Sequence, residues 1–149
     1  MKNKDEIPLA AQFGQQLGIV ATKYSALVAR LLEPHSLTLP QLAVLIHLAR
    51  RGEASRVSDI AKAVELTQSA VTKIVQKFDG HGLVTIARDQ RDGRNKPVQI
   101  TPQGAALLGA VQRSFGPAFA QLLDGWTPAR VEAMIADLSA LGAALDRMR

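Results

Sequence analysis

The stretch VSDIAKAVELTQSAVTKIVQKFDGHGLV, residues 57–84, decides the fold that the sequence predicts. Ser58 is placed to cap a short helix, and Thr67 is placed to cap a second one. The three residues Glu65-Leu66-Thr67 between them form a turn, short enough to hold two helices at a steep angle, with Leu66 buried beneath it. Apolar residues at helical spacing continue to Gly82, which ends the second helix. This stretch therefore predicts a helix-turn-helix.

A change of periodicity follows the helix pair. Two short stretches of β-branched and aliphatic residues predict strands on either side of a polar loop at residues 88–96. The apolar residues of these strands are Leu83, Val84 and Ile86, and then Val98 and Ile100. The loop carries four basic and two acidic side chains and is too long for a tight turn. A helix pair followed by such a hairpin is the pattern of a winged helix-turn-helix.

Amphipathic helices are predicted on the N-terminal side of this pattern. Apolar residues at intervals of three and four indicate a helix over residues 8–32, which Pro34 ends. A further helix begins at the cap Thr38, with Gln41 as its capping-box partner, and ends at Gly52. Its predicted buried face consists of Leu42, Leu45, Ile46 and Ala49.

The C-terminal third is also predicted to be helical. Thr101-Pro102 and Thr127-Pro128 are each a cap followed by proline at the first helical position, and Pro117 predicts a kink between them. The fold class is therefore mainly α with a small β-hairpin wing. We expect an N-terminal dimerisation helix (1–37), a winged helix-turn-helix DNA-binding domain (38–104) and C-terminal dimerisation helices (105–149). The long helices have more apolar surface than a small winged helix can cover, which favours a homodimer.

Composition excludes several function classes. The 149 residues include no cysteine, so disulfides, thiolate nucleophiles and cysteine-based zinc sites are excluded. No catalytic or nucleotide-binding motif occurs, and the three histidines lack metal-ligand spacing. We therefore expect no enzyme, no cofactor and no metal. The longest nearly apolar stretch, residues 39–49, is too short to span a membrane, so a cytoplasmic protein without membrane contact is expected.

The position of the positive charge indicates the partner. The formal net charge is +5, and residues 38–104 hold ten basic against six acidic side chains. The flanking segments 1–37 and 105–149 are nearly neutral. Cations that are concentrated on a winged helix favour double-stranded DNA over a membrane surface, which prefers them along an amphipathic helix.

Candidate DNA contacts lie on the second helix of the pair and on the hairpin loop. Short hydrogen-bonding and cationic side chains are the types that read base edges and bind phosphates. On the helix these are Gln68, Ser69, Thr72, Lys73 and Lys77. On the loop, the basic residues Arg91, Arg94 and Lys96 are able to enter a minor groove or follow the phosphates. A solvated helix face and an internally paired loop remain the alternative interpretations.

Three segments of the chain resemble the MarR family of bacterial transcription regulators. They are LTLPQLAVLIHL (37–48), the helix pair and following glycine at 57–84, and RDQRDGRNKPVQITPQG (88–104). Two residues depart from the family pattern. Gly93 replaces a second basic residue of the wing, and Glu65 replaces a glycine before the recognition helix.

The resemblance, which covers roughly residues 10–145, implies a homodimer on a palindromic operator. It makes Arg94 the wing-tip contact, oriented by Asp92. It also implies a repressor that a small, commonly aromatic effector releases from DNA. Candidates for a pocket between the helices are Tyr24, His35, His47 and Phe115, and ordinary packing explains them equally well. Two other functions stay open, an architectural DNA-binding protein of low specificity and a winged helix used for protein interaction.

Overall fold

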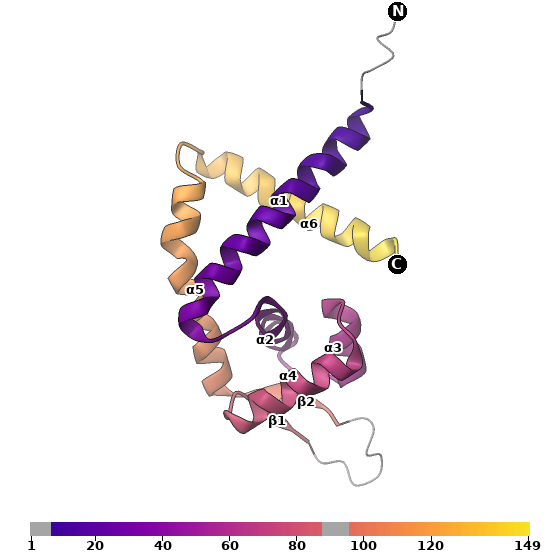
Figure 1. Ribbon diagram of the computed structural model, residues 1–149, viewed down its shortest axis with the longest axis vertical. Coiled ribbons are helices and arrows are strands. Elements are labelled where there is room, and N and C mark those ends of the chain that lie inside the picture. The colour runs from indigo at the N-terminus through magenta and orange to yellow at the C-terminus, as the bar shows by residue number, and fades with distance from the viewer. Residues whose placement is uncertain (1–6, 88–95) are drawn as a thin grey trace, which may run out of the picture. The chain divides into compact units, whose positions relative to one another are not determined.

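The computed structural model describes residues 7–87 and 96–149 and divides the chain into two compact units, Met1–Arg113 and Ser114–Arg149 (Figure 1). The first unit contains α1 (Leu9–Leu32), a 3-10 turn (Glu33–His35), α2 (Leu39–Arg51), α3 (Val57–Val64), α4 (Gln68–Gly80), β1 (Val84–Ile86), β2 (Val98–Ile100) and the first part of α5 (Pro102–Leu122). The second contains the rest of α5 and α6 (Pro128–Arg147). The predicted order of elements and the mainly helical class with a two-stranded wing are confirmed. The three-part division into dimerisation and DNA-binding segments stays a prediction.

Polar caps begin four of the helices. The Thr38 side chain accepts a hydrogen bond from the Gln41 amide at 3.3 Å, and the Gln41 side chain accepts one from the Thr38 amide at 3.0 Å. Thr67, Thr101 and Thr127 cap α4, α5 and α6 in the same way, without the reciprocal bond. Each cap satisfies a backbone donor that the first turn of a helix leaves unpaired. The predicted starts of these helices are confirmed.

The predicted cap of α3 is wrong. The helix begins at Val57, so Ser58 lies inside its first turn, and Arg56 holds the cap position without a side-chain hydrogen bond. The reason lies one residue earlier, because the backbone of Ser55 is bonded to Val98. That pairing keeps the chain extended up to Arg56, whose carbonyl then accepts the first helical bond from the Ile60 amide.

The turn between α3 and α4 adopts a left-handed conformation at Glu65, with φ of +58°. The Leu66 amide donates to the Ala61 carbonyl at 3.0 Å, which closes the end of α3. A side chain with a Cβ is disfavoured at positive φ, and glycine is the usual residue there. Leu66 is half-buried rather than fully buried as predicted.

The wing is wider than the predicted hairpin. β1 and β2 are antiparallel, with Val84 opposite Ile100 and Ile86 opposite Val98. On its other side, β2 bonds to Ser55: the Ser55 amide donates to the Val98 carbonyl at 2.8 Å, and the Val98 amide donates to the Ser55 carbonyl at 2.7 Å. The start of β1 was predicted one residue too early, at Leu83, whose amide instead bonds to the Phe78 carbonyl at the end of α4.

The core of the first unit lies among α2, α3, α4 and the base of the wing. Its fully buried side chains include Leu45, Leu48, Ile60, Val71, Phe78 and Val98. The prediction for α2 is only partly right, because Ala49 is exposed and Ile46 half-buried, whereas Val44 and Leu48 are buried. α2 packs against α1, α3, α4 and β2, so its buried surface is wider than one helical stripe.

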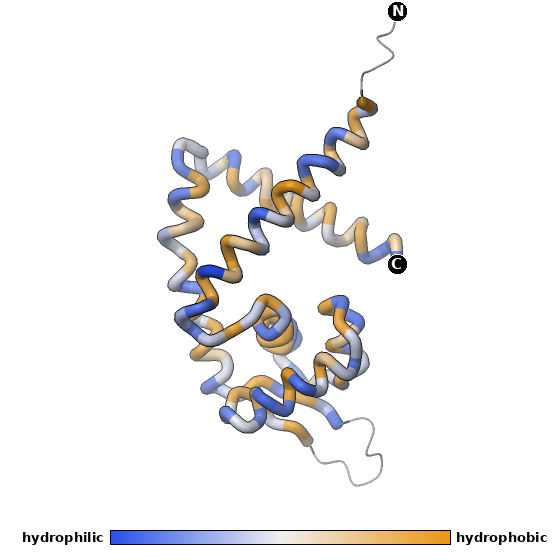
Figure 2. Tube along the Cα trace, viewed as in Figure 1, coloured by the Kyte–Doolittle hydropathy of each residue, from blue (hydrophilic) through white to orange (hydrophobic). Residues whose placement is uncertain are grey.

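The helices at the two ends of the chain expose apolar side chains. On α1, Leu9, Phe13, Ile19, Val20 and Tyr24 are exposed, and Figure 2 shows apolar residues recurring along this helix. On α6, no residue of the 20 is buried. Ile135, Leu138 and Leu145 are each more than half exposed.

Neither a membrane-spanning helix nor a metal site is found in residues 7–87 and 96–149. None of the helices there has both the length and the apolar character that crossing a membrane requires. In the same residues, no three histidine or acidic side chains come together as a group that could hold a metal ion.

Candidate nucleic-acid interface

The outer face of α4 collects the predicted helix contacts. Val71, Val75 and Phe78 are buried and fix the orientation of this helix on the core. On the remaining surface, Gln68, Ser69, Lys73 and Lys77 are exposed, whereas Thr72 is half-buried. The structure therefore brings together five side chains that can donate hydrogen bonds on one helix.

The N-terminus of α4 is suited to an anion. Thr67 caps it by accepting a hydrogen bond from the Ala70 amide at 3.1 Å. The first turn contains no acidic residue, so the positive end of the helix dipole is not neutralised there. A DNA phosphate is the kind of anion that binds at such a position.

An open groove of about 630 Å³ runs between α4 and the base of the wing. Gln68, Thr72 and Gln76 line it from α4, and Thr85 and Lys96 line it from the wing. Gln76 is a polar groove residue that the predicted contact set does not include, although its place one turn after Thr72 gives the signal. Lys96, the last residue of the predicted loop, is exposed and lines this groove.

The rest of the predicted wing contact set lies outside the described residues. Arg91, Arg94 and the orienting Asp92 fall within 88–95. Their roles stay predictions from the sequence.

The four candidates for an effector pocket are found in different surroundings. His35 lines a pocket of about 480 Å³ together with His81 and Gln103. His47 lines a separate pocket of about 550 Å³ between α2 and α3. In a single chain, these two histidines therefore line different pockets.

Neither of the two aromatic candidates, Tyr24 and Phe115, is among the residues that line the pocket at His35 or the pocket at His47. Tyr24 is half exposed on α1. Phe115 belongs to the second unit, is buried, and packs edge to face on Phe119 with ring centroids 5.7 Å apart. Their assignment to an effector site stays a prediction.

The pocket at His47 contains two residues that the sequence prediction missed. Arg50 and Arg51, at the end of α2, line it together with apolar residues of α2 and α3. Burial lowers the pKa of His47 below its ordinary value, Arg51 and Arg50 lower it further, and Asp59 opposes the shift. The imidazole is therefore favoured in its neutral form beside two guanidinium groups.

Comparison with known proteins gives a family and a fold. Residues 35–95 match the model of the MarR family. The HTH-type transcriptional repressor IacR of Pseudomonas putida is 33% identical over 116 residues, which are 78% of this chain and 69% of that protein.

Solved structures agree with the fold. A mutant form of MarR from E. coli, complexed with operator DNA, has a TM-score of 0.67 at 20% identity, covering 91% of this chain and 99% of that one. BpsR of Bordetella bronchiseptica, described as regulated in its DNA binding by 6-hydroxynicotinic acid, has a TM-score of 0.71 at 24% identity, covering 88% and 98%.

Proposed function

Because this chain belongs to the MarR family of winged helix-turn-helix regulators, we propose that it is a homodimeric repressor that binds a palindromic operator and is released by a small aromatic ligand. Its family makes it a DNA-binding transcription regulator rather than an enzyme. The dimer, the operator symmetry, the effector and the individual contact residues are the proposed part.

The observation that carries the proposal is the exposed polar face of α4. Ser69 and Lys73 project from a helix whose other side is fixed by the buried Val71 and Val75. A rigid helix with short hydrogen-bonding side chains near its N-terminus is suited to reading a major groove. The groove lined by Gln68, Thr72 and Lys96 joins this face of α4 to the base of the wing, whose predicted contact is Arg94.

The proposed dimer is supported by the exposed apolar side chains of α1 and α6. Leu138 on α6 is 55% exposed and Val20 on α1 is 59% exposed. Several exposed apolar side chains along one helix are unusual on a monomer and mark an interaction surface. A second copy of the chain would cover both helices by symmetry, and it would give two recognition helices for the two halves of a palindrome.

The proposed effector class is supported by the regulation described for BpsR and by the residues that line the pocket at His47. The effector of BpsR is an aromatic acid. The present chain combines arginines with apolar residues in one pocket, which suits a ligand with both a charge and an apolar body.

The test begins with DNA fragments selected from the host genome by binding to the protein. Fluorescence anisotropy at one stated salt concentration then compares a selected fragment with random DNA, and we expect at least ~10³-fold tighter binding to the fragment. Equal affinity for the two would instead support the architectural alternative. Failure to bind any DNA at low salt would support a protein-interaction role.

Variants test the contact residues on the same fragment. Lys73→Ala and Arg94→Ala are each expected to weaken binding by about tenfold while the fold is retained, because each removes a cation from the DNA-facing surface. Lys23→Ala, which removes an exposed cation from α1, is the matched control. Unchanged affinity for both test variants would refute the assigned surface.

A further inference from the structure

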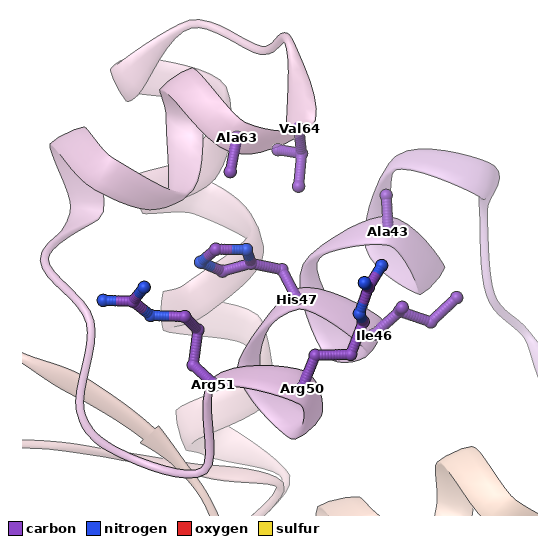
Figure 3. Close-up of a pocket in the computed structure, with 7 residues that line it drawn as sticks. All are labelled: Ala43, Ile46, His47, Arg50, Arg51, Ala63 and Val64. Atoms are coloured by element: carbon purple, nitrogen blue, oxygen red, sulfur yellow. The ribbon is translucent and has the colours of Figure 1, made fainter. Parts of the chain in front are cut away.

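The pocket at His47 surrounds an imidazole with groups that disfavour a positive charge. Its α3 wall consists of Ala63 and Val64, which are aliphatic, and its cations, Arg50 and Arg51, come from α2. Figure 3 shows the His47 ring facing the α3 residues, with the two arginine side chains extending on either side of it. Among the described residues that line the pocket there is no carboxylate. A proton on the ring would therefore add a third positive charge beside two others.

The Nε2 atom of His47 has no acceptor for a further proton. This atom is buried, and it forms no hydrogen bond with any residue in the described part of the chain. A protonated imidazole carries an N–H donor on both ring nitrogens. Because a buried donor without an acceptor costs free energy, the charged ring is favoured only where it turns away from α3 toward solvent.

Charged groups on two helices act on this imidazole. Burial lowers the pKa of His47 below its ordinary value, Arg51 and Arg50 on the same helix lower it further, and Asp59 on α3 opposes the shift. α2 also packs against α1, α4 and β2, but no described residue of these three elements lines the pocket. Both arginines and Asp59 are exposed, so solvent screens their effect, and burial is the largest cause. The contact of α2 with α3 therefore favours the neutral ring.

The pocket lies beside the turn that leads from α3 into α4. Val64 is the last residue of α3, and Thr67 caps α4 three positions later. The Leu66 amide donates a hydrogen bond to the Ala61 carbonyl at 3.0 Å, which fastens the turn to α3. The part of α3 that the His47 ring faces is therefore the part that joins directly to the helix proposed to read DNA.

We propose that the contact between α2 and α3 at His47 is a pH-sensitive switch, in which protonation of His47 loosens α3 from α2, changes the angle of α4 and weakens binding to DNA. The neutral ring packs against α3, whereas the charged ring is repelled by Arg50 and Arg51 and turns toward solvent. DNA binds the packed arrangement, so protons and DNA shift the same equilibrium in opposite directions. This inference rests on the proposed function of a DNA-binding regulator, and it adds a response to acidification that requires no ligand.

DNA affinity at two pH values tests the switch. Fluorescence anisotropy at one ionic strength measures the dissociation constant for a selected genomic fragment at about pH 7.5 and about pH 5.5, on either side of the ordinary pKa of histidine. We expect acidification to weaken binding of the wild type by about fivefold or more relative to His47→Gln, whose polar side chain takes up no proton. The other two histidines are present in both proteins, so this comparison cancels their effect. An equal response in the two proteins would overturn the proposal.

A second histidine provides the matched control. His81 is exposed at the end of α4 and does not line the pocket at His47. His81→Gln removes one titratable imidazole, as His47→Gln does, and it is expected to keep the wild-type response to pH. Loss of the response in His81→Gln would show that the proton acts elsewhere, and it would refute the assignment to His47.

Variants of the neighbouring charges test the direction of the electrostatics. Arg51→Gln removes repulsion from a charged His47, so the loss of affinity on acidification is expected to shrink by about twofold. Asp59→Asn removes the attraction that holds a charged ring near α3, so the loss is expected to grow by about twofold. Each variant is compared with itself at the two pH values, so a constant change in DNA affinity cancels. Responses in the same direction would contradict the switch, even if His47→Gln did not fold.

Hydrogen exchange on the DNA-free protein measures the conformational step. After correction for the intrinsic exchange rate, the amides of α3 are expected to lose protection at about pH 5.5 in the wild type and to keep it in His47→Gln. Unchanged protection in the wild type would refute the loosening of α3. Wild-type DNA binding at about pH 7.5 reports on the proposed function itself, so failure of the switch and failure of that function are distinguishable.

Discussion

α4 and α6 begin in the same way and differ in what covers them. Each follows a threonine whose hydroxyl accepts a hydrogen bond from the third amide of the helix. The 13 residues of α4 include three that are buried, and its exposed side is polar, whereas none of the 20 residues of α6 is buried and its exposed side is largely apolar. The same kind of cap thus begins two helices, but only α4 buries one of its faces within its own chain. We call α2–α4 with β1 and β2 the winged-helix region.

The largest expected effect is on stability, and it tests how tightly the start of α5 packs against the winged-helix region. A Cβ added at Gly104 would collide with the Leu83 carbonyl and lie 2.9 Å from the Ile100 side chain. We expect Gly104→Ala to lower the free energy of unfolding by about 3 kcal/mol, since backbone has to move. Denaturant unfolding measures it, with Gly80→Ala as control because a Cβ there meets nothing within 4 Å. A loss at Gly104 no larger than at Gly80 would mean that the region is loosely packed.

The next effect tests whether a second copy of the chain covers the exposed apolar side chains of α6. Leu138→Glu places a charge in the exposed apolar surface, and we expect the dissociation constant of the dimer to rise by about a hundredfold or more. Sedimentation velocity measures this constant, and circular dichroism should show that the helices remain. Asp137→Ala, a change at the adjacent exposed residue, is the control. A dimer that Leu138→Glu leaves intact would contradict the proposed role of α6.

A smaller effect concerns a strained point inside the winged-helix region. Glu65 has a φ of +58°, so Glu65→Gly is expected to be more stable than Glu65→Ala by about 1 kcal/mol. The alanine variant removes the same carboxylate but keeps the Cβ, which isolates the backbone contribution. Thermal unfolding compares the two. Equal stability would show that the turn accommodates a Cβ without cost.

The smallest effect concerns the pH dependence of the same region. Burial lowers the pKa of His47 below 6.5, Arg51 and Arg50 lower it further, and Asp59 on α3 acts in the opposite direction. The unfolded chain therefore binds a proton more readily, so stability is retained above pH 6.5 and lost as the pH falls below it. We compare melting temperatures at about pH 7.5 and about pH 5.5, where His47→Gln should lose less stability than the wild type. An equal loss of stability in the two proteins would show that His47 does not cause the pH dependence.

Local signals in the sequence predicted most of the fold. Thr38, Thr67 and Thr127 act through residues three positions away, so their capping roles can be read from the chain itself. The exposed polar face of α4 was predictable for the same reason, because helical periodicity separates Val71 and Val75 from Ser69 and Lys73. Short-range periodicity is enough where one side of a helix is buried.

Contacts between distant residues were not predictable in this way. The pairing of Ser55 with Val98 joins residues more than forty positions apart and moved the start of α3 away from Ser58. The pocket at His47 has the same origin, since it forms only when α2 brings Arg50 and Arg51 near Ala63 on α3. No local pattern reports which residues from two helices will share a pocket.

The Ser55–Val98 pairing connects the pocket helices to the wing. Ser55 lies in the short link between α2 and α3, and its two hydrogen bonds fasten that link to β2 at 2.8 Å and 2.7 Å. A change in the spacing of α2 and α3 must therefore carry β2 with it or break both bonds. The link is therefore a tether between the α2–α3 connection and β2, the strand that follows residues 88–95.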